Sequence, residues 1–126
     1  MRPHPPGHIA TLALTLAAMF AFCVPRAHAA ATLVSSIPTR YAALIHAPRI
    51  IQLRFSEAIV GKSSTVTLTD LTGHELRVSP LKARGDSSLE ARIAARLGPG
   101  VYMVHWTILS AVDGSKTVGS YQFTVH

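Results

Sequence analysis

The side chains best suited to bind a metal ion are Asp113, in a turn, and four histidines spread along the chain. Asp113 and Gly114 are a turn signal between two strand-like segments, and loops held between strands often carry binding residues. The histidines beyond the amino-terminal segment are His46, His74, His105 and His126. Carboxylates and imidazoles supply the oxygen and nitrogen donors of a metal site, but several must converge. No local spacing pairs these histidines, so for each we expect solvent exposure or a simple hydrogen bond.

Catalytic motifs are missing from the sequence, and we expect that the protein is not an enzyme. No serine lies in a strand-to-helix elbow near Asp113 and His105. The pair at residues 74–75 lacks the second histidine of a zinc-protease helix. Residues 84–86 (RGD) resemble an adhesion tripeptide, but three residues match too easily and a plain turn is the better interpretation.

The sequence offers few sulfur-containing side chains as metal ligands or for disulfides. Once residues 1–29 are removed, Met103 is the only methionine and no cysteine remains. A soft Cu(I) site built from thioethers is therefore poorly supported, and no disulfide can form.

Residues 1–29 are predicted to be a secretory signal peptide. A basic start with Arg2 precedes the apolar residues 9–24, and the small residues Ala27 and Ala29 follow. This run of 16 residues is shorter than the about 20 that a spanning helix needs, so a membrane anchor is the weaker alternative. We expect residues 30–126 to be an exported domain that does not span the membrane.

The exported chain carries a mild excess of positive charge. It keeps ten Lys and Arg against six Asp and Glu, a net charge of +4. The arginines are scattered along the sequence without a basic run or a nucleic-acid module, so a solvated surface is preferred and no nucleic-acid partner is expected. About 97 residues remain, enough for one domain with a single core.

Two strand-like segments must position the turn at Asp113. Side chains alternate faces along a strand, so each segment offers one apolar face to a core. In residues 100–108 that face holds Tyr102, Val104, Trp106 and Ile108; in residues 119–125 it holds Tyr121, Phe123 and Val125. Most of the aromatic core material lies here, including the only Trp.

Further strands are predicted at residues 32–36, 49–56, 65–70, 74–78 and 87–95. Helix is the alternative for residues 87–95, which the breaker at residues 98–100 (GPG) disfavours. Residues 38–48 are predicted to be a loop with Tyr41, Ala43 and Leu44 packed beneath it, and residues 80–86 a polar connection. About seven short strands with regular turns predict an all-β antiparallel sandwich.

The exported chain resembles the CopC family of periplasmic copper-resistance proteins. The matching pieces come in the family's order: residues 33–38 (LVSSIP), 51–57 (IQLRFSE), 97–106 (LGPGVYMVHW), 110–115 (SAVDGS) and 119–125 (GSYQFTV). The resemblance implies an immunoglobulin-like Greek-key β-sandwich over residues 30–126. It also implies carriage or delivery of copper, in some relatives beside a membrane copper-transport protein.

The resemblance also implies where a Cu(II) site would lie. The family's site takes the amine and imidazole of a first-residue His, then an Asp and a His from an Asp-Gly-His loop. Here Ala30 stands first and Asp113 matches, but Ser115 stands at the position of the second His. The loop is one residue longer, with Val112 the extra residue. Only Asp113 and the Ala30 amine carry over.

Two interpretations follow for the function. The first is a periplasmic copper-binding, copper-homeostasis protein of CopC type with a degenerate Cu(II) site. The alternative is a metal-free immunoglobulin-like sandwich that serves as a protein-interaction module in the cell envelope. Metal titration of the exported protein separates the two.

We predict cleavage after Ala29, since Ala27 and Ala29 follow a short apolar run. The intact mass of the exported protein should correspond to a chain that begins at Ala30. A chain beginning at His28 would contradict this prediction and would restore a histidine at the amino terminus.

Overall fold

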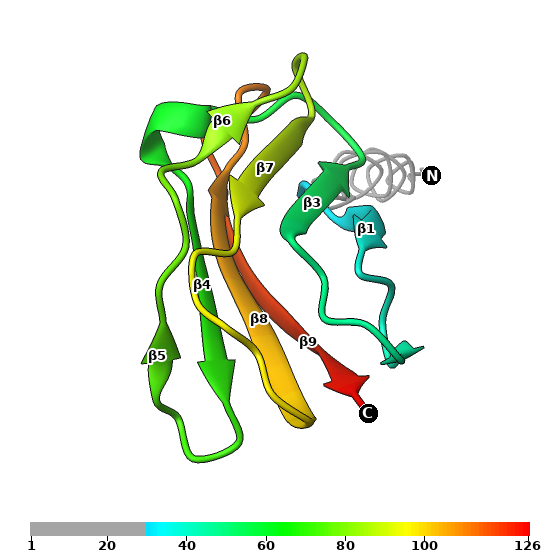
Figure 1. Ribbon diagram of the computed structural model, residues 1–126. Coiled ribbons are helices and arrows are strands. Elements are labelled where there is room, and N and C mark those ends of the chain that lie inside the picture. Colours follow the sequence, from blue (N-terminus) through cyan, green and yellow to red (C-terminus); the bar gives the residue numbers. More distant parts are fainter. Residues whose placement is uncertain (1–29) are drawn as a thin grey trace, which may run out of the picture.

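The computed structural model describes residues 30–126 as two β-sheets packed face to face (Figure 1). The first sheet has the strand order β1 (Leu33–Ile37), β3 (Ile50–Phe55), β7 (Ser88–Arg92) and β6 (Lys82–Ala83). The second has the order β2 (Ala43–Leu44), β9 (Lys116–Val125), β8 (Gly100–Leu109), β4 (Thr65–Asp70) and β5 (Glu75–Leu76). A short 3-10 helix, η2 (Gly61–Ser63), precedes β4. The predicted signal peptide lies outside the described residues.

The predicted all-β sandwich is confirmed, with two strands more than expected. The sequence pattern missed β2 and β6, which are two residues long each and lie in segments predicted to be loops. Strands this short carry too few residues for an alternating pattern to show. In addition, β2 pairs with β9 in the parallel direction, so the second sheet is mixed and not purely antiparallel. No helix within residues 30–126 is long and apolar enough to cross a membrane.

The hairpin of β8 and β9 is the longest pairing and supplies much of the core. Its register runs from Gly100 opposite Val125 to Leu109 opposite Lys116. The predicted inward faces are confirmed, since Tyr102, Val104, Trp106, Ile108, Tyr121, Phe123 and Val125 are all buried. Ile51, Leu53 and Phe55 of β3 close the core from the other sheet.

Trp106 sits where the two sheets meet. Its ring makes an edge contact with Phe55 at 6.2 Å between centroids and a tilted contact with Tyr121 at 6.1 Å. Gly119 is its partner across the hairpin, and a Cβ added at Gly119 would collide with the indole ring. The indole therefore fills the space that a side chain at residue 119 would need.

Two of the three residues expected to pack beneath the segment after β1 do not do so: Ala43 is exposed at the start of β2, and Tyr41 points outward. Tyr41 was predicted to pack beneath the loop, but its side chain is 76% exposed. The residue has φ of +57° and its backbone nitrogen donates to the Gln122 carbonyl at 2.7 Å. Tyr41 thus has a left-handed backbone conformation, which is uncommon outside glycine, and its ring points to solvent. Ala42 and Leu44 pack against the core in its place.

Replacing Trp106 with Ala should lower the free energy of unfolding by about 3–5 kcal/mol, as for other buried aromatic residues. Gly119→Ala should cost about 1–3 kcal/mol, because the added methyl group overpacks the core. Chemical denaturation of the single variants and of the double variant tests both values. In the Trp106→Ala background, Gly119→Ala should cost much less, and an unchanged cost would show that the indole does not impose the glycine.

Stability should fall at alkaline pH through Tyr121. Burial raises the pKa of this phenol to about 12 from the ordinary value of 10.0. A group whose pKa is raised by folding contributes stability below its unfolded pKa and loses that contribution as the pH approaches the folded value. Tyr121→Phe should therefore flatten the decline in melting temperature between pH 10 and about 12. Tyr41→Phe, at an exposed ring, is the control that should leave the decline unchanged.

Candidate metal centre

The loop that joins β8 to β9 is closed by hydrogen bonds to Ser110. This residue is 1% exposed. Its backbone nitrogen donates to the Ser115 carbonyl at 2.8 Å, and its carbonyl accepts from the Gly114 nitrogen at 3.1 Å. Its hydroxyl accepts from the Val112 nitrogen at 3.1 Å. Gly114 has φ of +74°, which glycine adopts without steric cost. The loop is a compact turn that leaves Asp113 exposed at the end of the hairpin.

Ser115 hydrogen-bonds to the carboxylate of Asp113. Both the backbone nitrogen and the hydroxyl of Ser115 donate to Asp113 Oδ1, at 2.9 and 2.7 Å. The residue at the expected histidine position therefore engages the one predicted ligand side chain in a local turn. A hydroxyl is a far poorer donor to Cu(II) than an imidazole, so the loop offers oxygen ligands only.

Hydrogen bonds connect the chain next to Ala30 and the loop that carries Asp113 to one intervening segment. The segment at residues 56–59 links the two. Ser56 exchanges hydrogen bonds with Thr32, at 2.8 and 3.0 Å, and Ala58 accepts from the Ala111 nitrogen at 2.9 Å. The two predicted ligand positions thus flank one short segment, and their assignment as ligands stays a prediction.

Glu57 lies in this segment and was not predicted as a site residue. Its Oε1 is buried and has no hydrogen-bond partner within the described residues. A buried carboxylate oxygen without a partner is costly, and a cation or an ordered water would satisfy it. The signal in the sequence was an acidic residue directly after the core strand at residues 51–56. Glu57 is thus a further acidic residue in the segment between the two predicted ligand positions.

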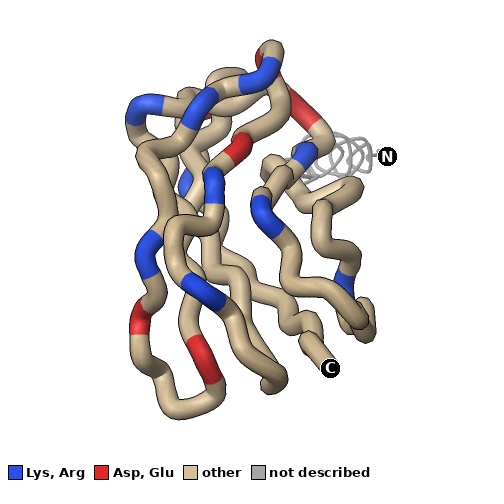
Figure 2. The backbone as a smooth tube through the Cα atoms, viewed as in Figure 1, with Lys and Arg blue, Asp and Glu red and all other residues tan. Residues whose placement is uncertain are grey.

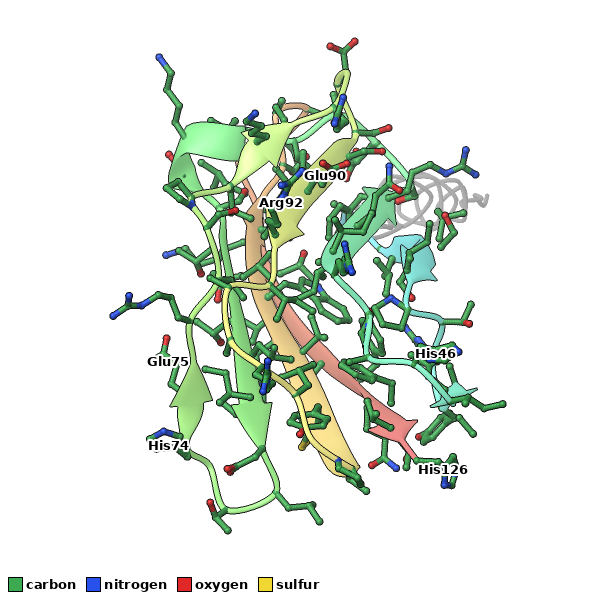
Figure 3. The ribbon with its side chains drawn as sticks, in the orientation of Figure 1. His46, His74, Glu75, Glu90, Arg92 and His126 are labelled. Carbon is green, nitrogen blue, oxygen red and sulfur yellow. The ribbon has the colours of Figure 1, made fainter. Side chains whose placement is uncertain are left out.

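The histidines are not gathered at this site. His105 is half-buried on the outer face of the second sheet, with Nε2 3.0 Å from Thr69 Oγ1. The others are exposed, and Figure 3 shows His74 on one edge of the molecule and His46 and His126 on the opposite side. This agrees with the expected solvent exposure or simple hydrogen bond for each. Across residues 30–126, no three His, Cys, Asp or Glu side chains are grouped closely enough to hold a metal ion.

His74 follows a turn organised by Asp70. Asp70 Oδ1 accepts from the backbone nitrogens of Thr72 and His74, at 2.9 and 3.0 Å, and from the Thr72 hydroxyl at 2.7 Å. The Thr72 hydroxyl bond is the main cause that holds the pKa of Asp70 below its ordinary value. This exposed carboxylate completes a β4–β5 turn, so it has a structural role that needs no metal.

The family model of the CopC domain matches residues 33–126. The chain belongs to the CopC family. Curated relatives agree: the chain is 34% identical to Protein YobA of Escherichia coli over 103 residues, which cover 80% of this chain and 82% of YobA. Protein YobA of Shigella flexneri matches equally well. The resemblance stated from the sequence is thus confirmed.

Two solved structures share the fold. CopC from Methylosinus trichosporium superposes with a TM-score of 0.70 at 26% identity, covering 76% of this chain and 93% of that structure. PcoC, described as a methionine-rich copper resistance protein from Escherichia coli, gives a TM-score of 0.66 at 32% identity, with 79% and 100% covered. This chain has a single methionine, Met103, within residues 30–126. The scaffold is therefore shared while the methionine content differs.

Proposed function

We propose that this protein is a periplasmic copper-binding protein of CopC type, active in copper homeostasis or resistance, whose Cu(II) site is degenerate. The observation that carries the proposal is the combination of a CopC domain over residues 33–126 with Ser115, not histidine, bonded to Asp113. The ion is cargo that the protein binds and passes on, and a membrane copper-transport protein is the proposed recipient. No catalysis is proposed.

The ligand chemistry explains why binding would be weak. Cu(II) prefers a tetragonal set of nitrogen and oxygen donors, and imidazoles supply most of the affinity. The candidate donors are the Ala30 amine, which exists only after cleavage at that residue, with Asp113 and Glu57. An amine titrates near about 8, so protons compete with the metal at neutral pH. Two carboxylates and an amine support a low-affinity site that releases its ion readily.

The alternative function is a metal-free sandwich that contacts another protein of the cell envelope. Such a protein would keep the CopC fold without binding copper. The absence of a grouped ligand set in residues 30–126 favours it, whereas the buried, unpartnered Oε1 of Glu57 favours a cation beside that residue. Copper titration of the exported protein decides between the two.

Restoring the family histidines should restore the site. Ala30→His with Ser115→His should strengthen Cu(II) binding by orders of magnitude, because two imidazoles and the amine then join Asp113. Val112 lengthens the loop, and the residues that orient the ligands in the family can differ here. The affinity of the double variant for Cu(II) should therefore stay below that of a complete family site. The measurement is competition titration against a chelator of known affinity. Thr39→His with Ser63→His, which adds two histidines at other exposed positions, should produce no such gain.

Asp113→Ala should change Cu(II) binding little in the wild type, because the few donors present seldom hold a metal without imidazole. In the Ala30→His, Ser115→His background the same change should cost at least about tenfold, since ligands of one site are strongly coupled. The same competition titration measures both. Tight one-to-one binding by the wild type would contradict the proposal and direct mutagenesis to His46, His74, His105 and His126.

A further inference from the structure

Strand pairing gathers basic residues that are scattered in the sequence onto one face of the molecule. On the outer face of the first sheet, Arg54 lies opposite Ser88, and Lys82 lies opposite Glu90. Arg92 shares the face of Glu90, because Ala91 between them points into the core, as Leu89 before Glu90 does. Arg84 joins them, since its side chain bonds to Glu90. We name Arg54, Lys82, Arg84 and Arg92 the cationic face; Figure 2 shows their strands toward the viewer.

Glu90 is the one acidic residue in β3, β6 and β7, and several basic residues lie close to it. Arg84 grips it with two hydrogen bonds, from Nε at 3.1 Å and from an Nη at 3.0 Å. The Arg84 hydrogen bond, followed by the charges of Arg84, Lys82 and Arg92, lowers the pKa of Glu90. One carboxylate cannot neutralise four cations. Figure 3 shows Glu90 and Arg92 next to each other on β7.

The face is concave beside β6. A hollow of about 480 Å³ is lined by Ser79, Pro80, Leu81, Lys82, Arg84, Glu90 and Arg92. Its volume lies within the range of ligand sites, about 300–1,000 Å³. The outer face of the second sheet differs sharply: β8 has no Lys, Arg, Asp or Glu, and β9 has Lys116 alone. The cationic face therefore carries more positive charge than the outer surface of β8 and β9.

We propose that the cationic face docks a carboxylate-rich segment of a partner protein. Arginine presents a planar fork of donors that matches a carboxylate, and Arg84 already shows this geometry with Glu90. A membrane surface fits less well, because basic interfacial segments pair their charge with apolar side chains that enter the lipid. The large exposed apolar residues of the described chain all lie outside β3, β6 and β7; those in the same sheet, Val34 and Ile37, are on the edge strand β1.

The test is fluorescence anisotropy with a labelled poly-glutamate peptide and the exported chain. Lys82→Glu with Arg92→Glu should weaken binding at least about tenfold, because complementary charges become repulsive. Arg40→Glu with Lys116→Glu makes the same change in net charge at exposed residues outside the hollow, and should change affinity less than about twofold. Equal losses would mean a net-charge effect and would overturn the proposal, as would failure of the wild type to bind. Thermal melts confirm that both variants fold.

Two further measurements sharpen the outcome. Glu90→Gln should tighten peptide binding, because it removes the carboxylate that competes for Arg84; weaker binding would contradict the proposed role of the face. Sedimentation with phosphatidylglycerol vesicles tests the membrane as the alternative. Vesicle binding that the Lys82, Arg92 variant loses, without peptide binding by the wild type, would assign the face to lipid and overturn the proposal.

Discussion

The fit of Trp106 against Gly119 is the constraint on which the rest of this sandwich depends. It sets the register of the β8–β9 hairpin, because only a glycine leaves room for the indole at the paired position. A slip of one residue in either strand would turn the inward side chains of that strand to solvent. The same register ends the hairpin at residues 110–115 and so determines where Asp113 is presented.

The long elements of the fold could be predicted because their patterns are local. Alternation in residues 100–108 and 119–125 identified the buried faces, which the structure confirms at Val104 and Phe123. The strands β2 and β6 could not be predicted, since two residues form no pattern and β2 is selected by its parallel contact with β9. Tyr41 was misplaced for a similar reason: its exposure follows from the backbone of the loop and not from its hydrophobicity.

The candidate site and the cationic face could be predicted from the sequence only in part, because both depend on contacts between distant segments. Asp113 and Ser115 were readable from the sequence, but their mutual hydrogen bonds depend on the loop conformation that Ser110 closes. Glu57 was overlooked because the buried state of Oε1 is a property of the packed sandwich. The arginines appeared scattered because Arg54 and Arg92 are far apart in sequence, and only the pairing of β3 with β7 places them on one face. The spacing of residues along the chain does not show which side chains strand pairing brings together.

We propose that this CopC-family chain offers Cu(II) a site without imidazole. Pulsed electron paramagnetic resonance of the exported protein, loaded with less than one equivalent of Cu(II), tests it most directly, because the remote nitrogen of a coordinated imidazole modulates the echo. We expect a spectrum of oxygen and amine ligands with no imidazole modulation. Modulation from one or more imidazoles would contradict it and would show that histidines from separate strands bind the ion.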